Sequence, residues 1–162
     1  MRGIIAVLVL ACSVTSRADD GVRAQAQPAG KHLVYLELLG KGGLYGIGYE
    51  YAIAPWLGAG GAASFAQLRG EQTFTVSPYL HITALSGTHH ALFGELGAIL
   101  AHARVPSPVM GWDGASDTGG GGFAALGWEY RRGRVVLRTS GAIVVGEGGI
   151  APMLGIAIGV RP

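Results

Sequence analysis

The sequence predicts an all-β protein: an eight-stranded antiparallel up-and-down transmembrane β-barrel that follows a cleaved signal peptide. Runs of alternating residues succeed one another, most of them longer than the five or six residues of an average strand. Large apolar residues lie on one face of these runs, and small or charged residues on the other. Charged residues make up 14% of the chain, whereas a soluble domain carries about 25%.

The N-terminal segment resembles a secretory signal peptide, because a short basic n-region precedes an apolar run too short to span a bilayer. We expect residues 1–18 to form this peptide, residues 19–30 a flexible periplasmic segment and residues 31–162 the barrel. Cleavage after Ala26 is an alternative to cleavage after Ala18. Cys12 is either discarded with the peptide or acylated at a partial lipobox, and as the sole cysteine it permits no intrachain disulfide.

The eight expected strands are bounded by short Gly-containing or Pro-containing separators, which favour hairpins. Most are long enough for the roughly 9–11 residues that a strand needs to cross a bilayer. Residues 104–119 are predicted to form one long loop. The expected strands are residues 32–39, 43–53, 56–68, 72–85, 90–103, 120–131, 134–145 and 150–160.

A transmembrane helix over residues 141–160 is the rival reading of the C-terminal region, because the stretch contains only one charge, Glu147. The Gly155/Gly159 pair would suit helix packing. However, glycines surround Glu147, Pro152 follows, and both halves alternate with period two. Two strands therefore remain the preferred interpretation.

The residues on the two faces of the strands indicate which face points to the polar interior and which to lipid. Glu50 shares its face with Gly46 and Gly48, and bulky Ile47 and Tyr49 lie opposite. A soluble barrel would need bulky apolar residues inside, whereas a narrow membrane barrel places them against lipid. In FTVSPYLHITAL (74–85) the same logic turns the apolar set outward, including a proline at position 78 for which we expect a β-bulge.

Charges that face a narrow lumen must be paired or hydrated. Glu129 and Arg138 are expected to be close diagonal neighbours across one hairpin. We therefore hypothesise a polar network that plugs the lumen. Its predicted members are Glu37, Glu95, Glu129, Arg138, Tyr79 and His81.

Aromatic residues gather on the large-residue face, close to strand ends that should lie on one side of the membrane. Such a set is typical of an interfacial girdle, although ordinary cross-strand pairing is an alternative. With a periplasmic N-terminus, the short turns are periplasmic and the long predicted loop is external. The predicted girdle residues are Tyr49, Tyr51, Trp128 and Tyr130.

The chain resembles the small eight-stranded bacterial outer-membrane barrels of the OmpA-transmembrane-domain type. The segments that carry the likeness are residues 1–18, GGLYGIGYEY (42–51), FTVSPYLHITAL (74–85) and GFAALGWEY (122–130). The resemblance implies a Gram-negative outer membrane, with its lipids and its barrel assembly machinery as partners. The end of the chain departs from the pattern, because such barrels usually close on an aromatic residue and this one ends Gly-Val-Arg-Pro.

The sequence contains no recognisable catalytic motif, so a structural or interaction role with little solute flux is the leading hypothesis. A lipid-modifying barrel enzyme is one alternative, for which His81, Thr83 and Ser140 are the nearest pieces. A soluble periplasmic lipocalin-like binder is the other. We expect neither a cofactor nor a metal, and we expect a monomer. We also expect no nucleic-acid partner, since the formal charge is only +2.

Overall fold

The structure is a computed structural model that describes residues 30–41, 43–68, 71–105, 114–147 and 149–162. The predicted signal peptide, and all of the predicted periplasmic segment but Gly30, lie outside these ranges. No helix in the described ranges is both long and apolar enough to cross a membrane. Residues 141–160, for which a helix was the rival reading, form strands on either side of a turn.

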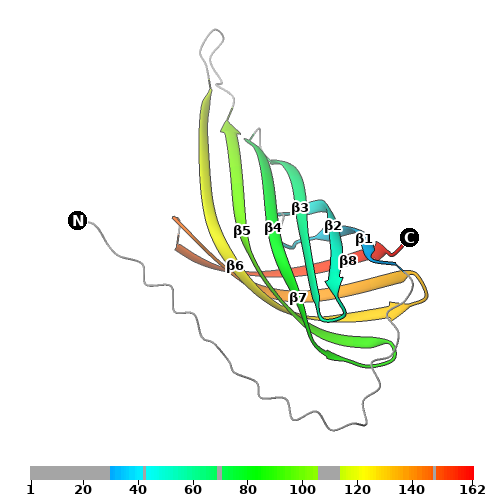
Figure 1. The fold of residues 1–162 in the computed structure, drawn as a ribbon. Coiled ribbons are helices and arrows are strands. Elements are labelled where there is room, and N and C mark those ends of the chain that lie inside the picture. The colour runs from blue at the N-terminus through cyan, green and yellow to red at the C-terminus, as the bar shows by residue number, and fades with distance from the viewer. Residues whose placement is uncertain (1–29, 42, 69–70, 106–113, 148) are drawn as a thin grey trace.

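Eight antiparallel strands follow one another in chain order and close into a barrel, with the last strand paired to the first (Figure 1). The predicted fold is confirmed, and most strand boundaries differ from the expected ones by only one or two residues. The strands are β1 (His32–Leu38), β2 (Tyr45–Ala54), β3 (Leu57–Leu68), β4 (Glu71–Ser86), β5 (His90–Val105), β6 (Ala115–Arg132), β7 (Val135–Gly146) and β8 (Gly149–Val160).

The prediction of one long loop over residues 104–119 was wrong at both of its ends, and residues 106–113 in its middle lie outside the described residues. β5 continues to Val105 and β6 begins at Ala115, and the two remain paired to their ends. β6 has 18 residues, more than the roughly 9–11 that a tilted strand needs to cross a bilayer. The Gly, Ser and Asp residues that suggested a loop are accommodated because backbone pairing, with a contact of 2.8 Å between His102 Nδ1 and Thr118 Oγ1, continues this hairpin beyond the rest of the barrel (Figure 1).

The predicted bulge at Pro78 was also wrong. Pro78 lies opposite Gly61 in an unbroken ladder between β3 and β4. On the β5 side the Cα pairing lapses at Ser77 and Pro78 and resumes in the same register at Tyr79. The bulge of β4 lies instead between Thr83 and Leu85. Pro78 has no N–H to donate, and the strand pairing accommodates it by a local gap rather than by an extra residue.

The exterior of the barrel is apolar and its interior is polar. Leu126 and Leu154 are 77% and 75% exposed, whereas Glu129 is 0% exposed. Between Phe74 and Leu85 of β4, the exposed side chains are the apolar set that includes Phe74 and Leu80. The orientation that the sequence predicted for the strand faces is therefore the observed one.

Each bulky aromatic ring in the interior lies opposite a glycine on a neighbouring strand. The rings cross the space that a side chain on the facing strand would otherwise occupy, so the small residues make the interior wide enough for them. The pairs are Tyr35 with Gly48, Tyr79 with Gly60 and Gly97, Phe93 with Gly127, and Phe123 with Gly97.

Candidate functional site

A network of ion pairs fills the middle of the lumen, and Arg138 of β7 lies at its centre. Its Nη1 and Nη2 donate to the two carboxylate oxygens of Glu50, at 2.7 and 3.0 Å. Its Nε donates to Glu129, the residue directly opposite on β6. Glu129 and Arg138 are therefore direct partners, closer than the diagonal neighbours that the sequence predicted. A two-pronged guanidinium–carboxylate pair is both strong and geometrically specific.

Lys41 reaches into the lumen from the connection between β1 and β2. Its Nζ donates to Glu95 Oε2 at 2.7 Å and lies 3.5 Å from Glu37 Oε1. The ammonium also lies 4.3 Å from the centre of the Tyr79 ring. Burial opposes the charge of Lys41, but the carboxylate of Glu95, the Tyr35 phenol and the carboxylate of Glu37 together raise its pKa to about 12.

The backbone of this connection is tied to the barrel wall as well. The Ser77 hydroxyl donates to the carbonyl of Lys41 at 2.9 Å. Leu39 has a φ of 57°, and its N–H donates to the carbonyl of Leu44 at 2.9 Å. The segment therefore holds the lysine over the end of the lumen opposite the β2–β3 turn.

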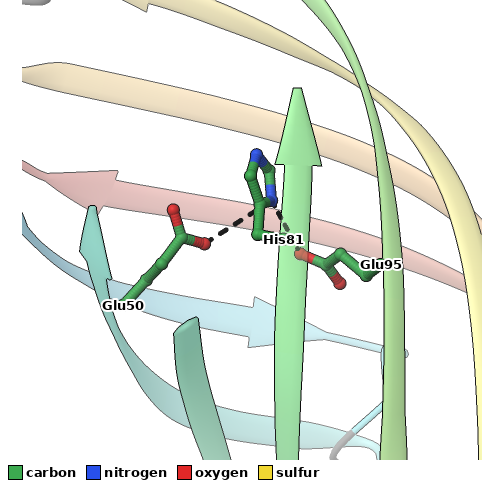
Figure 2. A group of neighbouring side chains, drawn as sticks. All are labelled: Glu50, His81 and Glu95. Atoms are coloured by element: carbon green, nitrogen blue, oxygen red, sulfur yellow. Dashed lines mark hydrogen bonds and ion pairs between the residues drawn. The ribbon is translucent and has the colours of Figure 1, made fainter. Parts of the chain in front are cut away.

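His81 lies between two carboxylates, one from each side of β4 (Figure 2). Its Nδ1 is 3.3 Å from Glu95 Oε1 and 3.6 Å from Glu50 Oε2. The imidazole stacks on the Phe93 ring at 4.8 Å and contacts Thr83 through Nε2. The ring is thus fixed by packing on one side and by polar contacts on the other.

Two tyrosines extend the network with neutral hydrogen bonds. The Tyr35 hydroxyl donates to the Tyr79 hydroxyl at 2.9 Å, and Tyr79 donates to Glu50 Oε2 at 3.3 Å. Glu50 therefore receives contacts from Arg138, His81 and Tyr79. Such a buried acceptor is well satisfied, as buried carboxylates in proteins must be.

The part of the network closest to the β2–β3, β4–β5 and β6–β7 turns contains two further arginines, which lie around Glu129. Arg131 Nε donates to Glu129, and Arg161 Nη2 lies 3.9 Å from it. A cavity of about 10 Å³ lies beside these residues, which is room for about one water molecule. Among the described residues, the ion pairs of the lumen join four carboxylates to four Lys or Arg cations: Glu37, Glu50, Glu95 and Glu129 with Lys41, Arg131, Arg138 and Arg161.

Glu50, His81 and Glu95 each offer one ligand atom, and these atoms lie within 4.8 Å of one another. Carboxylate and imidazole donors would suit a divalent cation. However, Arg138 Nη1 is 2.7 Å from Glu50 and 3.9 Å from Glu95, and Lys41 is bonded to Glu95. A metal here would meet a guanidinium in a lumen whose charges are already balanced. The geometry therefore favours an ion-pair network over a metal centre.

All six residues predicted for the lumen network are buried inside the barrel. Arg138 contacts Glu129 directly, His81 contacts Glu95, and Glu37 and Glu95 are bridged by Lys41. The members that sequence reasoning omitted are Tyr35, Lys41, Glu50, Arg131 and Arg161.

The omitted residues differ in how easily the sequence could have predicted them. Tyr35 is two residues from Glu37, so alternation alone would have placed it in the lumen. Glu50 was placed on the lumen face but was not assigned to the network. Lys41 and Arg161 lie outside the strands, where alternation carries no information about direction.

The four predicted girdle residues lie on the outer face near the end of the barrel that carries the β2–β3, β4–β5 and β6–β7 turns. The Tyr49 hydroxyl is 2.7 Å from His32 Nδ1, and the His32 and Tyr51 rings are 5.3 Å apart. Trp128 and Tyr130 stack at 6.2 Å, with His90 against both. The aromatics therefore form two groups, one on β1–β2 and one on β5–β6.

Solved structures of bacterial barrels share this fold. The N-terminal β-barrel domain of Pseudomonas aeruginosa OprF aligns with a TM-score of 0.59 at 14% identity, over 81% of this chain and 95% of that chain. Ail, the attachment invasion locus protein of Yersinia pestis, aligns with a TM-score of 0.51 at 14% identity, over 81% and 95%. The Ail complex with the heparin analogue sucrose octasulfate gives 0.52 at 13%, over 81% and 96%.

The chain has the fold of the small eight-stranded outer-membrane barrels. No protein-family model matches the sequence, and no curated protein matches it significantly. The likeness to these barrels, at 13–14% identity, is therefore one of fold.

Replacing Lys41 with methionine tests whether this residue stabilises the barrel. Methionine keeps much of the length and apolar stem but leaves Glu95 without its 2.7 Å partner. We expect the free energy of unfolding to fall by about 1–3 kcal/mol, the cost of a buried group that loses its partner. Urea unfolding of the barrel in lipid vesicles measures this change. The matched control is Lys31→Met, because Lys31 is exposed, and an equal effect of both substitutions would contradict the prediction.

Proposed function

We propose that the protein is an integral barrel of the bacterial outer membrane with a structural or interaction role, whose lumen is closed by the Glu/Arg network and passes little solute. Its partners are outer-membrane lipids and, during insertion, the barrel assembly machinery. The observation that carries the proposal is the buried set of ion pairs enclosed by an apolar exterior. The two features together suit a wall that faces lipid and an interior that excludes it.

The exterior supports membrane insertion. Each strand places at least one large apolar side chain on the outer face, β3 through Phe65, and several of them, among them Leu36, Ile47, Leu96 and Ile156, are more than half exposed. A contiguous apolar surface of this extent is rare on a soluble monomer. The lipocalin-like alternative requires an interior ligand cavity, whereas the interior here contains ion pairs and aromatic rings.

The residues that fill the lumen support the proposal that it passes little solute. Arg138 and Glu50 join β7 to β2 across the interior, and Lys41 joins the β1–β2 connection to β5. Eight strands enclose a lumen only wide enough for side chains. Ions would therefore have to displace several buried pairs in order to cross.

The environment of His81 argues against a lipid-modifying enzyme. The imidazole is 3% exposed and faces Glu95, Glu50 and Thr83 inside the barrel. A lipid substrate approaches from the outer face, which is the opposite side of the strand. His81 is therefore best explained as a member of the network.

Cell fractionation and a gel assay test the membrane assignment. We expect the full chain in the outer-membrane fraction and expect it to migrate faster on a gel before boiling than after, because a closed barrel resists detergent. Recovery of the folded protein from the soluble periplasmic extract would overturn the assignment.

Planar-bilayer recordings test the closed lumen separately. We expect no steady conductance steps from the wild-type barrel. We expect steps from a double variant, Lys41→Ala with Arg138→Ala, that removes both cross-lumen cations. Steady conductance from folded wild-type protein would contradict the closed lumen while leaving the membrane assignment intact.

A further inference from the structure

Among the described residues, the exposed acidic side chains of the barrel are confined to one of its two ends. We define the turn end as the end with the β2–β3, β4–β5 and β6–β7 turns. Among the exposed Asp, Glu, Lys, Arg and His residues that the structure describes at this end, all are basic. The exposed acidic side chains lie at the opposite end, together with the basic residues His102 and Arg104. The basic set is Lys31, His32, His89, His90, Arg132 and Arg134, and the acidic set is Glu71, Asp117 and Glu147.

The basic residues form a continuous arc rather than scattered positions. The Arg131 N–H donates to the His89 carbonyl at 2.7 Å, so the β4–β5 turn lies against the end of β6. The Arg161 N–H donates to the Arg134 carbonyl at 2.8 Å, which ties the end of β8 to the β6–β7 turn. β8 in turn pairs with β1, which begins just after Lys31. The arc therefore runs from β5 through β6, β7 and β8 to β1.

Aromatic rings lie beside both ends of this arc. His90 stacks on Trp128 at 5.2 Å, and His89 stacks on Tyr130 at 6.3 Å. At the other end His32 lies 5.3 Å from Tyr51. Trp and Tyr side chains favour the boundary between hydrocarbon and headgroups. The arginines and histidines next to them are thus at the depth of lipid phosphates.

We propose that this basic arc binds the headgroups of anionic phospholipids in the leaflet at the turn end. The proposal rests on membrane insertion of the barrel, as proposed above. The chemistry fits, because arginine forks donate two parallel hydrogen bonds to a phosphate and no exposed Asp or Glu side chain in the described part of this end competes. The opposite end mixes three exposed acidic side chains with His102 and Arg104, so the barrel presents different charges to the two leaflets.

Tryptophan quenching by brominated lipids tests the proposal. Trp56 and Trp128 lie at the turn end, so Trp112→Phe leaves both reporters there. The barrel is reconstituted in phosphatidylcholine vesicles that contain an equal mole fraction of either brominated phosphatidylglycerol or brominated phosphatidylcholine. We expect quenching to be about twofold stronger or more with the anionic lipid at low salt, and the difference to shrink in high salt as screening increases.

Two variants in the same background distinguish the effect of the basic arc on lipid preference from the effect of the overall charge of the protein. Arg132→Gln with Arg134→Gln should abolish most of the anionic preference, whereas Arg104→Gln, at the opposite end, should retain it. Equal quenching by the two lipids in the parent protein, retention of the preference in the double variant, or its loss in Arg104→Gln would overturn the proposal. No quenching by either lipid would instead show that the barrel is not inserted, which is a failure of the proposed function itself.

Discussion

Replacing Arg138 with alanine is expected to lower the free energy of unfolding by about 3–5 kcal/mol, the usual cost of removing one partner from a buried ion pair. The loss is large because Arg138 donates to Glu50 and Glu129 at once. Both carboxylates remain buried after the substitution. Urea unfolding in lipid vesicles, followed by tryptophan fluorescence and by gel migration, measures the change.

The matched control for this variant is Arg134→Ala. Arg134 is an exposed arginine close to the start of the same strand, so its removal should change stability by less than about 0.5 kcal/mol. A second variant separates charge from packing: Arg138→Met with Glu50→Gln should recover part of the lost stability, because it removes one of the unpaired charges. Equal stabilities of Arg138→Ala and Arg134→Ala would contradict a structural role for the network.

Replacing Gly48 with alanine is expected to destabilise the barrel by about 1–3 kcal/mol, the usual cost of overpacking an interior. The added Cβ would lie within the space of the Tyr35 ring, which faces Gly48 across β1 and β2. The ring cannot move freely, because its hydroxyl donates to Tyr79. The same unfolding measurement applies.

Gly141→Ala is the control, because Gly141 is exposed on the outer face and the nearest atom to its Cβ is a Leu154 methyl at 3.8 Å. We expect its effect to be small. In a Tyr35→Ala background the penalty of Gly48→Ala should largely vanish, since the clash partner is gone. A penalty that persists in that background would show that the glycine is needed for backbone reasons instead.

Some features of the barrel were predictable because they depend on neighbours along the chain. Strand positions and the assignment of faces follow from a period of two, which is a local property of an extended backbone. The same alternation placed Tyr79 and His81 in the interior and Phe74 and Leu80 outside. Glu129 and Arg138 could be linked because one tight turn joins their strands.

Other features depend on distances that the chain does not encode locally. Glu50 and Arg138 are separated by 88 residues, and they meet only because the pairing of β8 with β1 closes the barrel and brings β2 and β7 within reach across a narrow lumen. The position of the β4 bulge depended on register with β5, since Pro78 could be accommodated by a gap in pairing. The β5–β6 hairpin extended through residues that looked like a loop because each strand had the other as a partner.

Alternation along the chain was enough to predict a barrel with an apolar outside and a polar inside, because it fixes the direction of every strand residue. Which charges pair with each other became visible only in the folded barrel. Lys41 belongs to a connection with no periodic signal, yet it enters the lumen because Glu95 and Glu37 lie within reach there. The pairing of charges is a property of the closed ring of strands, since closure alone fixes the distances across the lumen.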